Sequence, residues 1–579
     1  MRPSISSVVW LGAILSQAAA GMAGAQTIYP LNRAEILAGA RFDLKVEFPG
    51  APAADAIHVT INGEDAASVA GKAASVVERE DGGDWSAYWI RDTVFPRPGT
   101  YVVEATAGSS TARVTWQVFD TPPATAKNVI LFIGDGLSVA HRTAARILSK
   151  GLVEGRYGGD LAIDDMPYMA LVSTSGSDAV VTDSANSMTA YVAGQKSCVN
   201  ALGVSCARNR NNLEHPRIET ISEIVKPRGV SVGVVTNTEI EDATPAAMVA
   251  HTRRRTDYDD IVRMFFAIQP EVIMGGGSLN FLPKPDGGRR ADGVNYLTKF
   301  TDVGYTYVTT RTELAAAKDA SRLLGLFNTG NVDGALDRFF LKQGTVARFP
   351  DQPDLTDLVT AALEVLAKND RGFVLMVESG RIDKYSHSLD WERAIYDTIM
   401  LDNAVKLAKD FAARRNDTLV IVVADHAHPV SIVGTYDDDY PGSELRDKLG
   451  PYQFSVAPNY PAPNADGYPD RVDVSRRLAF VFGAFPDYCD TGHPHLEGEN
   501  EPTVAGPAPH TFVANEKYCL PGAARRTGNL PPALNLGVHA ADDVVLTAMG
   551  PGAEAFHGRI DNTRVFRIMA TALGLGRGN

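Results

Sequence analysis

The sequence is poor in cysteine, has no excess of basic residues and contains no long apolar run beyond its first 25 residues. Four cysteines among 579 residues are too few for a fold held mainly by disulfides. A formal net charge of −14 argues against nucleic-acid binding as the main function. A membrane span needs about 20 apolar residues, and no such stretch follows. With 45% apolar and 21% charged residues and no tandem repeat, the sequence predicts a soluble globular protein.

The N-terminus has the pattern of a cleaved export signal. Arg2 precedes an apolar run from Val8 to Leu15, and Ala23-Gly24-Ala25 forms a small-x-small cleavage site. A membrane anchor is disfavoured because the apolar run is too short to span a bilayer. We therefore predict that residues 1–25 are a signal peptide and that the protein is exported, to the periplasm or the medium.

Export sets the expectation for the cysteines. Thiols persist poorly in an oxidising compartment, and the four cysteines fall into two pairs along the chain. Cys198 and Cys206 enclose a short loop, and Cys489 and Cys519 close a longer one. Both pairs are expected to be bridged, although spacing alone does not establish the connectivity.

The region from residue 26 to residue 121 is predicted to be an all-β domain. Apolar residues at positions 42, 44, 46 and 48 alternate with Asp43, Lys45 and Glu47, which is typical of a half-buried strand. Turn signals such as Asn62-Gly63 separate this run from similar ones. We predict a small immunoglobulin-like sandwich. It contains no cluster of ligand-type residues, so a spacer or stabilising role is the simplest hypothesis.

Residues 122–579 follow a different pattern and are predicted to form the catalytic domain. Near-continuous apolar runs of strand length alternate with helical stretches such as Leu358–Ala367 and Trp391–Arg414. This predicts an α/β fold, a central mostly parallel sheet covered by helices on both faces. A loop-rich insertion at about residues 437–532, a lid or an oligomer contact, precedes the last strand, which we place at Asp543–Met549. The other predicted strands are Asn128–Ile133, Val230–Thr236, Gly372–Val377 and Thr418–Ala424.

Polar residues follow the predicted strands at the edge where ligands of such sheets bind. A single motif is weak evidence for a metal site, because a Gly-Asp-Gly such as residues 134–136 is most often only a turn. Several carboxylates converging on one point, however, would repel one another without cations. Imidazole with carboxylate suits zinc, and carboxylate with hydroxyl suits magnesium. The sequence therefore indicates a multi-metal site drawn from Asp135, Asp242, Thr244, Glu378, Asp383, His387, Asp425, His426, His428 and His539.

Ser184 is the candidate nucleophile. It precedes the helical stretch Ala185–Ala193, so it would lie at a helix N-terminus, where backbone N–H groups favour an anion. An N-cap serine would give the same pattern. The metal ligands nearby favour the nucleophile, since zinc activates a hydroxyl.

With these residues the chain resembles the metal-dependent alkaline phosphatases in their bacterial serine-nucleophile form. The most specific feature is Glu378, Asp383 and His387 together with Asp-His-Ala-His at 425–428. The matching fragments are Asn128–Gly136, Thr182–Val204, Asp242–Arg255, Val377–His387, Val422–His428 and Gly537–Leu573. The resemblance implies hydrolysis of phosphate monoesters with two Zn²⁺ and one Mg²⁺ per chain.

The resemblance also implies a role for each residue. One zinc would take Asp383, His387 and His539, and the other Asp135, Asp425 and His426. Magnesium would share Asp135 and add Thr244 and Glu378. Ser184 would attack phosphorus, Arg255 would clamp phosphate oxygens, and His428 would support Asp383 from behind. Asp242 and Lys384 match the forms that use magnesium as the third ion and would lie at the substrate.

Two alternatives stay open from the sequence. The first is a phosphodiesterase of the same superfamily, which would generally lack the third-metal pair of Thr244 and Glu378. A sulfatase on this fold would need a Cys/Ser-x-Pro-x-Arg motif, which Ser184 does not stand in. A non-catalytic exported metal-binding surface protein would have lost its nucleophile or its arginine. Nucleic acid is not expected as a partner, and a homodimer is left open.

Overall fold

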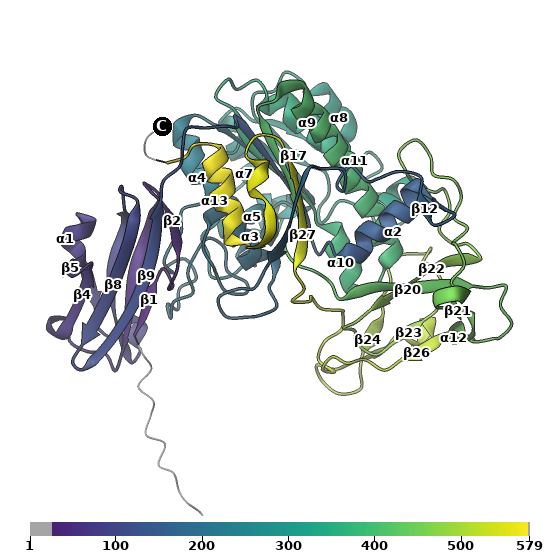
Figure 1. Cartoon of the computed structure of the whole chain (residues 1–579), viewed down its shortest axis with the longest axis horizontal. Coiled ribbons are helices and arrows are strands. Elements are labelled where there is room, and N and C mark those ends of the chain that lie inside the picture. The colour runs from purple at the N-terminus through teal and green to yellow at the C-terminus, as the bar shows by residue number, and fades with distance from the viewer. Residues whose placement is uncertain (1–25, 577–579) are drawn as a thin grey trace, which may run out of the picture.

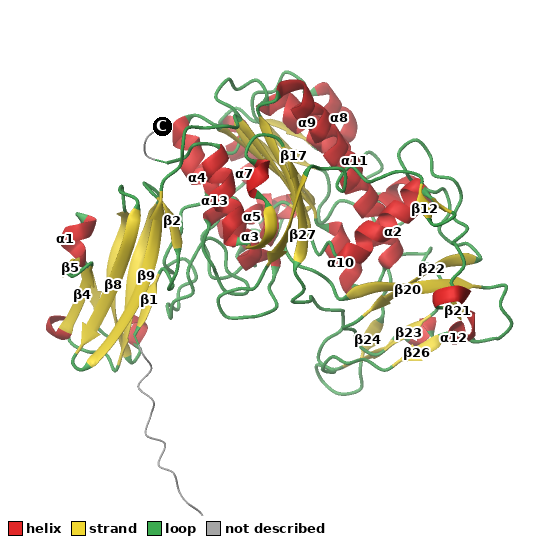
Figure 2. Cartoon of the chain, viewed as in Figure 1, coloured by secondary structure: helices red, strands yellow, loops and turns green. Residues whose placement is uncertain are grey.

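The computed structural model describes residues 26–576, so the predicted signal peptide lies outside the described residues. The chain forms three regions, of which the third is inserted between two strands of the second (Figure 1). The N-terminal β region lies at the left of the view, the central sheet in the middle and the loop-rich insertion at the lower right. Helices cover both faces of the central sheet (Figure 2), which confirms the predicted fold class.

The N-terminal region is a sandwich of two sheets. Their strand orders are β1-β3-β7-β6 and β2-β9-β8-β4-β5. Trp116, Phe42 and Phe95 pack in the core between the sheets, with Phe42 and Trp116 edge to face at 5.7 Å. The strands are β1 Thr27–Tyr29, β2 Glu35–Leu37, β3 Arg41–Pro49, β4 Ile57–Ile61, β5 Glu64–Asp65, β6 Ser75–Val77, β7 Trp85–Val94, β8 Gly99–Ala107 and β9 Ser110–Phe119.

The prediction that β3 is half buried was wrong, because both of its faces are buried. Asp43, Lys45 and Glu47 are only 3%, 0% and 2% exposed. Their face is covered by a segment some 160 residues further along the chain, which pairs with them. Lys45 Nζ donates to Asn209 Oδ1 at 2.8 Å, and Asp43 Oδ2 accepts from the Arg217 amide at 3.1 Å. The alternating pattern therefore marks an interface between two regions instead of a surface facing water.

The central sheet has the order β16-β17-β15-β14-β18-β10-β19-β27-β13-β28. Its pairings are parallel from β16 to β19, whereas β27 runs antiparallel to both neighbours. The predicted last strand corresponds to β27, but β28 follows it and forms the edge of the sheet. The strands are β10 Asn128–Gly134, β13 Tyr168–Ser173, β14 Ser231–Glu239, β15 Val272–Gly276, β16 Thr306–Val308, β17 Leu323–Leu326, β18 Phe373–Ser379, β19 Thr418–Val423, β27 Val544–Met549 and β28 His557–Asp561.

Two groups of helices enclose this sheet (Figure 2). The first contains α2 Val139–Lys150 and α9 Leu355–Leu366, which both pack on α11 Trp391–Arg415. The second contains α3 Ser184–Ala193, α4 Ile221–Val225, α5 Ala243–Ala246 and α13 Thr563–Ala572. Two shorter elements matter for the site: α10, Arg381–His387, continues from β18, and α6, Tyr258–Ile268, follows Arg255. No helix in residues 26–576 combines the length and apolar character that crossing a bilayer requires.

The insertion is held by small sheets and one disulfide. β20 Val430–Asp437 leads into the insertion and pairs there with β21 Leu449–Gly450 and β22 Arg476–Phe482. The other strands pair as β23 Tyr488–Asp490 with β26 Ala524–Arg526, and β24 Thr503–Ala505 with β25 Phe512–Ala514. Glu499 ties it to the central region, since its carboxylate accepts from Ser388 Oγ at 2.9 Å. The bridges Cys198–Cys206 and Cys489–Cys519 confirm both predicted disulfides.

Candidate active site

Parallel strands that end at one edge of the sheet bring the predicted ligands together. In the pairing of β10 with β18, Ile133 lies beside Glu378, which places Asp135 and α10 at neighbouring strand ends. β19 lies on the other side of β10 and delivers Asp425 and His426. Because β27 is antiparallel, the segment that enters it carries His539 to the same edge.

Asp383 and two histidines form the first candidate metal centre. His387 Nδ1 lies 2.6 Å from the Gly537 carbonyl, and His539 Nδ1 lies 2.8 Å from the Thr182 carbonyl. A carbonyl only accepts, so each Nδ1 carries the proton and each Nε2 keeps a free lone pair. These Nε2 atoms are 3.1 Å apart, and each lies 3.3 Å from Asp383 Oδ1. Two lone pairs facing a carboxylate are arranged as a cation requires.

His428 contacts the Asp383 carboxylate and belongs to the same group of possible ligands as His387 and His539. Its Nε2 lies 2.7 Å from Asp383 Oδ1, and its main chain is fixed by Ser138. Gly136 explains part of the Gly-Asp-Gly motif, because its φ is +66° and a Cβ there would lie 2.7 Å from the His428 ring. Only glycine lets the chain pass so close to this imidazole.

Asp135, Asp425 and His426 form the second candidate centre. His426 Nε2 lies 3.3 Å from Asp135 Oδ1 and 3.2 Å from Asp425 Oδ2. Both oxygens are buried and have no hydrogen-bond partner among the described residues. Asp425 Oδ1 is oriented by the Gly136 amide at 3.1 Å. Buried carboxylate oxygens without partners fit a bound divalent cation.

Glu378 and Thr244 offer further oxygen donors, and the charge of Glu378 acts on Asp135. Glu378 Oε2 accepts hydrogen bonds from Thr236 and, at 3.1 Å, from Thr238 Oγ1. Thr244 Oγ1 is buried and has no hydrogen-bond partner within the described part of the chain. A set of carboxylates and a hydroxyl without nitrogen is the donor chemistry of Mg²⁺.

The pKa shifts show the cost of gathering these charges without cations. Burial, with Asp383 and Asp425 nearby, raises the pKa of Asp135 well above its usual range. Burial first and Asp383 second raise the pKa of Asp425 to about 6, and burial with Asp242 raises that of Glu378 to about 7. Burial alone would raise the pKa of Asp383 too, but His387 and the other imidazoles hold it well below its usual range.

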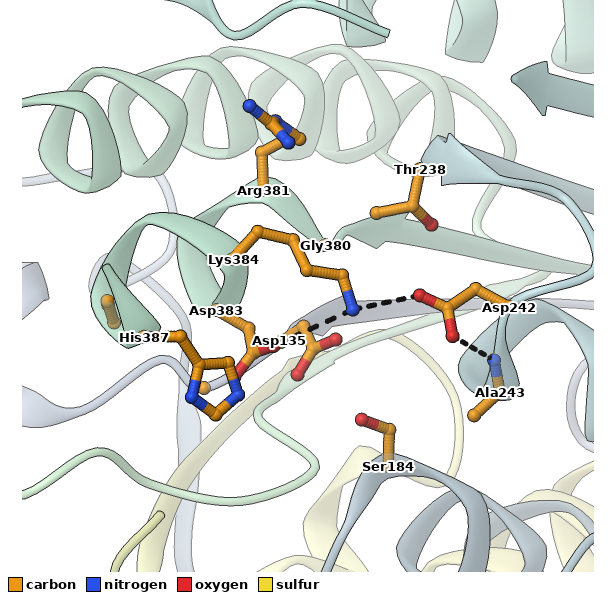
Figure 3. A network of polar contacts seen from close by, with 12 residues as sticks. Asp135, Ser184, Thr238, Asp242, Ala243, Gly380, Arg381, Asp383, Lys384 and His387 are labelled. Atoms are coloured by element: carbon orange, nitrogen blue, oxygen red, sulfur yellow. Dashed lines mark hydrogen bonds and ion pairs between the residues drawn. The ribbon is translucent and has the colours of Figure 1, made fainter. Parts of the chain in front are cut away.

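Ser184 is the first residue of α3 and points into the space between the candidate centres. Asp183 caps the helix by accepting from the Asn186 amide at 3.2 Å. Since Asp183 is the cap, Ser184 is free of that task, and its Oγ lies 3.4 Å from His426 Nε2. Figure 3 shows its hydroxyl directed towards the space between Asp135 and Asp242.

Arg255 and Lys384 bring positive charge to the same space. Arg255 donates to Asp242 Oδ1 at 2.7 Å and to Asp183 Oδ2 at 3.4 Å. Lys384 Nζ lies 2.9 Å from Asp242 Oδ2 (Figure 3). Burial would lower the pKa of Lys384, but Asp242 raises it above its usual value, so Lys384 stays charged. The Asp242 carboxylate therefore orients the positively charged side chains of Arg255 and Lys384 towards the site.

The sequence did not single out every residue of the site. Asp183, which caps α3 and pairs with Arg255, could have been found as an acidic N-cap before Ser184. Thr236 and Thr238 could not, because two threonines inside a strand have no distinguishing pattern. The carbonyls of Thr182 and Gly537 carry no side-chain signal at all.

The comparisons with known proteins agree with this geometry. The alkaline phosphatase family model matches residues 126–450. The tissue-nonspecific alkaline phosphatase of Gallus gallus is 32% identical over 493 residues, covering 78% of this chain and 85% of that protein. The alkaline phosphatase of Gadus morhua is 31% identical over 490 residues, covering 78% and 92%.

Solved structures show the same fold. The Thermus thermophilus alkaline phosphatase has a TM-score of 0.56 at 26% identity, covering 79% of this chain and 93% of that one. The alkaline phosphatase of the Antarctic bacterium TAB5 has a TM-score of 0.53 at 21% identity, covering 78% and 100%. The chain belongs to the alkaline phosphatase family, whose reaction is the hydrolysis of phosphate monoesters.

Proposed function

We propose that the enzyme hydrolyses phosphate monoesters through a phosphoserine on Ser184. The observation that carries this proposal is the position of the Ser184 hydroxyl. It lies at the N-terminus of a buried helix and 3.4 Å from His426 Nε2, between two sets of metal-type donors. From that position the hydroxyl can attack phosphorus. Backbone N–H groups, and cations held by the donor sets, would stabilise the charge that develops on the phosphoryl oxygens.

The donor sets support two zinc ions and one magnesium ion. Asp383, His387 and His539 would hold one zinc, and Asp135, Asp425 and His426 the other. Asp135 with Thr244 and Glu378 would hold magnesium. A solved relative with this fold, a variant of the TAB5 enzyme, has magnesium bound in its M3 site. When bound, the zinc ions would lower the pKa of a hydroxyl ligand and neutralise charge on phosphoryl oxygens.

The chain's own residues divide the reaction into two displacements. In the first, Ser184 Oγ forms a bond to phosphorus while the ester P–O bond breaks and the alcohol leaves. In the second, a water oxygen bonds to phosphorus while the bond to Ser184 Oγ breaks, and phosphate is released. Arg255 holds two phosphoryl oxygens through both steps, in the bidentate geometry that guanidinium favours. Asp242 and Asp183 keep its guanidinium in place.

The alternative of a phosphodiesterase is less well supported. Diesterase relatives generally lack the pair Thr244 and Glu378; here Glu378 acts on the pKa of Asp135, and the buried Thr244 hydroxyl has no hydrogen-bond partner among the described residues. A comparison of hydrolysis rates for an aryl phosphate monoester and the matching diester separates the two activities. We expect the monoester to be the faster substrate.

The phosphoserine is tested by product partition. If every monoester passes through one covalent intermediate, water and an added acceptor alcohol compete for that same species. The ratio of free phosphate to transferred phosphate is then expected to be the same for aryl and alkyl leaving groups, even where overall rates differ. Ratios that follow the leaving group would show direct attack by water and remove Ser184 from the nucleophilic role.

Arg255→Ala is expected to lower kcat/KM for monoesters by about 10- to 100-fold and to weaken inhibition by phosphate, because a charge-assisted clamp is lost. Metal content should not change, since Lys384 still pairs with Asp242. Arg254→Ala is the matched control, as this neighbouring arginine is exposed and touches neither Asp242 nor Asp183. The assignment would be off by one residue if Arg254→Ala gave the larger loss with a simple monoester.

Three further features belong to the proposal. We propose that the chain is divided into a β domain at residues 26–121 and a catalytic domain at residues 122–579. Export after removal of residues 1–25 agrees with the two disulfides, which form most readily outside the cytoplasm. Measuring the molecular mass in solution tests whether the protein is a homodimer.

A further inference from the structure

A second concentration of positive charge lies beside the proposed phosphate clamp. It is a pocket of about 520 Å³ whose lining contains five arginines and no carboxylate. In a chain with a net charge of −14 this is a local reversal of sign. We call it the basic pocket; its charged and imidazole residues are Arg208, Arg210, His215, Arg253, Arg254 and Arg255.

Most of this charge is not neutralised by the protein. Within residues 26–576, the side chains of Arg210, Arg253 and Arg254 form no ion pair with a carboxylate. The guanidinium of Arg208 reaches Glu47 only at 3.8 Å. Guanidinium groups bind phosphate and carboxylate groups through paired, charge-assisted hydrogen bonds, so an open pocket that gathers arginines without carboxylate partners favours an anionic ligand.

His215 is a buried imidazole in the wall of the basic pocket and is 2% exposed. Burial first, with Arg253 nearby, lowers the pKa of His215 to about 4, so the ring is neutral. The backbone at Asn209 and Ser205 lies beside the ring, but neither nitrogen makes a hydrogen bond of good geometry within the described residues. A neutral ring has one N–H, which can donate to a backbone carbonyl or to a bound oxyanion.

The basic pocket is continuous with the proposed active site. Arg255 lines the pocket, and its guanidinium also donates to Asp242 and Asp183. Asn200, in the same wall, donates its amide to Asp183 Oδ2 at 3.0 Å and accepts from the Arg255 amide at 2.8 Å. A molecule with one phosphate at Ser184 can therefore meet the pocket across Arg255.

The β domain fixes the far wall of the pocket. The amide of Arg208 donates to Glu47 Oε1 at 2.7 Å, and the amide of Arg210 donates to Asp81 Oδ2 at 2.8 Å. Lys45 holds the side chain of Asn209 between them. Both arginines are thus carried on a segment whose backbone is anchored to another region, which reduces the entropy lost when they bind a ligand.

We propose that the basic pocket is a subsite for a second phosphate group of the substrate, so that organic bisphosphates are preferred over matching monophosphates. This inference rests on the proposed function of Ser184 for the position of the first phosphate. Arg210 and Arg254 contact the second phosphate, His215 donates its N–H, and Arg255 lies between the two anions. The linker between the phosphates sets how well both are reached.

The test compares alkanediol bisphosphates of two to six carbons with the alkyl monophosphates of equal length. After division by two for the two equivalent ends, kcat/KM for the best bisphosphate should exceed that of its monophosphate by about tenfold, as expected for charge-assisted contacts. Arg210→Gln with Arg254→Gln should abolish this preference and change the monophosphate by less than about twofold, since exposed substitutions perturb stability little. Arg97→Gln is the matched control, because Arg97 is an exposed arginine of the β domain that forms no ion pair within residues 26–576.

Binding separates this inference from the proposed function. The Ser184→Ala protein should bind 1,6-hexanediol bisphosphate more tightly than hexyl phosphate, and the added arginine substitutions should remove the difference. Equal affinities and equal corrected kcat/KM values, or a preference that survives both arginine substitutions, would overturn the subsite while leaving monoester hydrolysis intact. Loss of the Ser184 mechanism with retained arginine-dependent binding would refute the proposed function alone.

Discussion

Ser184→Ala is expected to lower kcat for phosphate monoesters by at least about a thousandfold, because removal of a covalent nucleophile leaves only direct attack by water. The substitution removes one oxygen from the first turn of α3 and leaves Asp183 as the cap. The candidate metal ligands make no hydrogen bond that depends on Ser184 except the 3.4 Å contact with His426. Metal content and unfolding temperature should therefore stay near those of the parent.

Ser187→Ala is the matched control for this experiment. Ser187 lies one turn further along the same buried helix, and its hydroxyl donates to the Asp425 carbonyl at 2.5 Å. Its loss removes a hydrogen bond worth about 1 kcal/mol but no nucleophile. Activity should remain within about tenfold of the parent. A Ser184→Ala enzyme that keeps a tenth of the activity with its metals bound would exclude the covalent route.

The sequence predicts the buried central strands of the sheet, but neither its edge strand nor the direction of every strand. Continuous apolar runs such as Asn128–Ile133 are unmistakable because both faces of those strands are buried. The short edge strand β28 has exposed and half-exposed residues, so it lacks that signal. The direction of β27 depends on its neighbours, which no local pattern records.

Burial across an interface is equally invisible in the sequence. Lys45 appears as a solvent-facing residue of an alternating strand, yet it is fully buried with Glu47 and Glu80 at 2.8 and 2.7 Å. Its further partner, Asn209, lies 164 residues away. The same separation hides the basic pocket, because Arg208 and Arg210 come close to Arg254 only after folding.

The candidate site, too, can be predicted only in part from the sequence. Side chains that carry the chemistry, such as Asp383 and His387, stand in a spacing specific enough to be recognised. What orients them is largely backbone, as with the Gly537 carbonyl that fixes the tautomer of His387. Backbone acceptors leave no trace in the sequence, so the protonation of the imidazoles can be argued only from the structure.

Exhaustive removal of divalent ions is expected to abolish activity, by at least about a thousandfold, and to lower the unfolding temperature by about 5 °C or more. The ions are expected to be about two zinc and one magnesium per chain, because two donor sets contain imidazole and one contains only oxygen. Zinc with magnesium should restore most of the activity, and zinc alone less. Elemental analysis of each protein alongside its rate makes the comparison. An enzyme that stays fully active after its ions are shown to be gone would refute the metal proposal.

Asp383→Asn locates this dependence within the site. Asp383 Oδ1 lies within 3.3 Å of the Nε2 atoms of both His387 and His539, the two imidazoles of the first candidate centre. Replacing the carboxylate by an amide removes its charge and leaves its shape, so zinc should be lost and activity should fall by at least about a hundredfold. Asp402→Asn is the matched control: Asp402 is 4% exposed, and its hydrogen-bond donors within the described part of the chain are main-chain amides of the α2–β13 connection, such as that of Ile163 at 2.9 Å. An amide can accept that bond too, so the control should keep its metals and its rate. If Asp383→Asn retained both zinc ions and full activity, Asp383 would not be a ligand, and the first centre would have to be built on His428 instead.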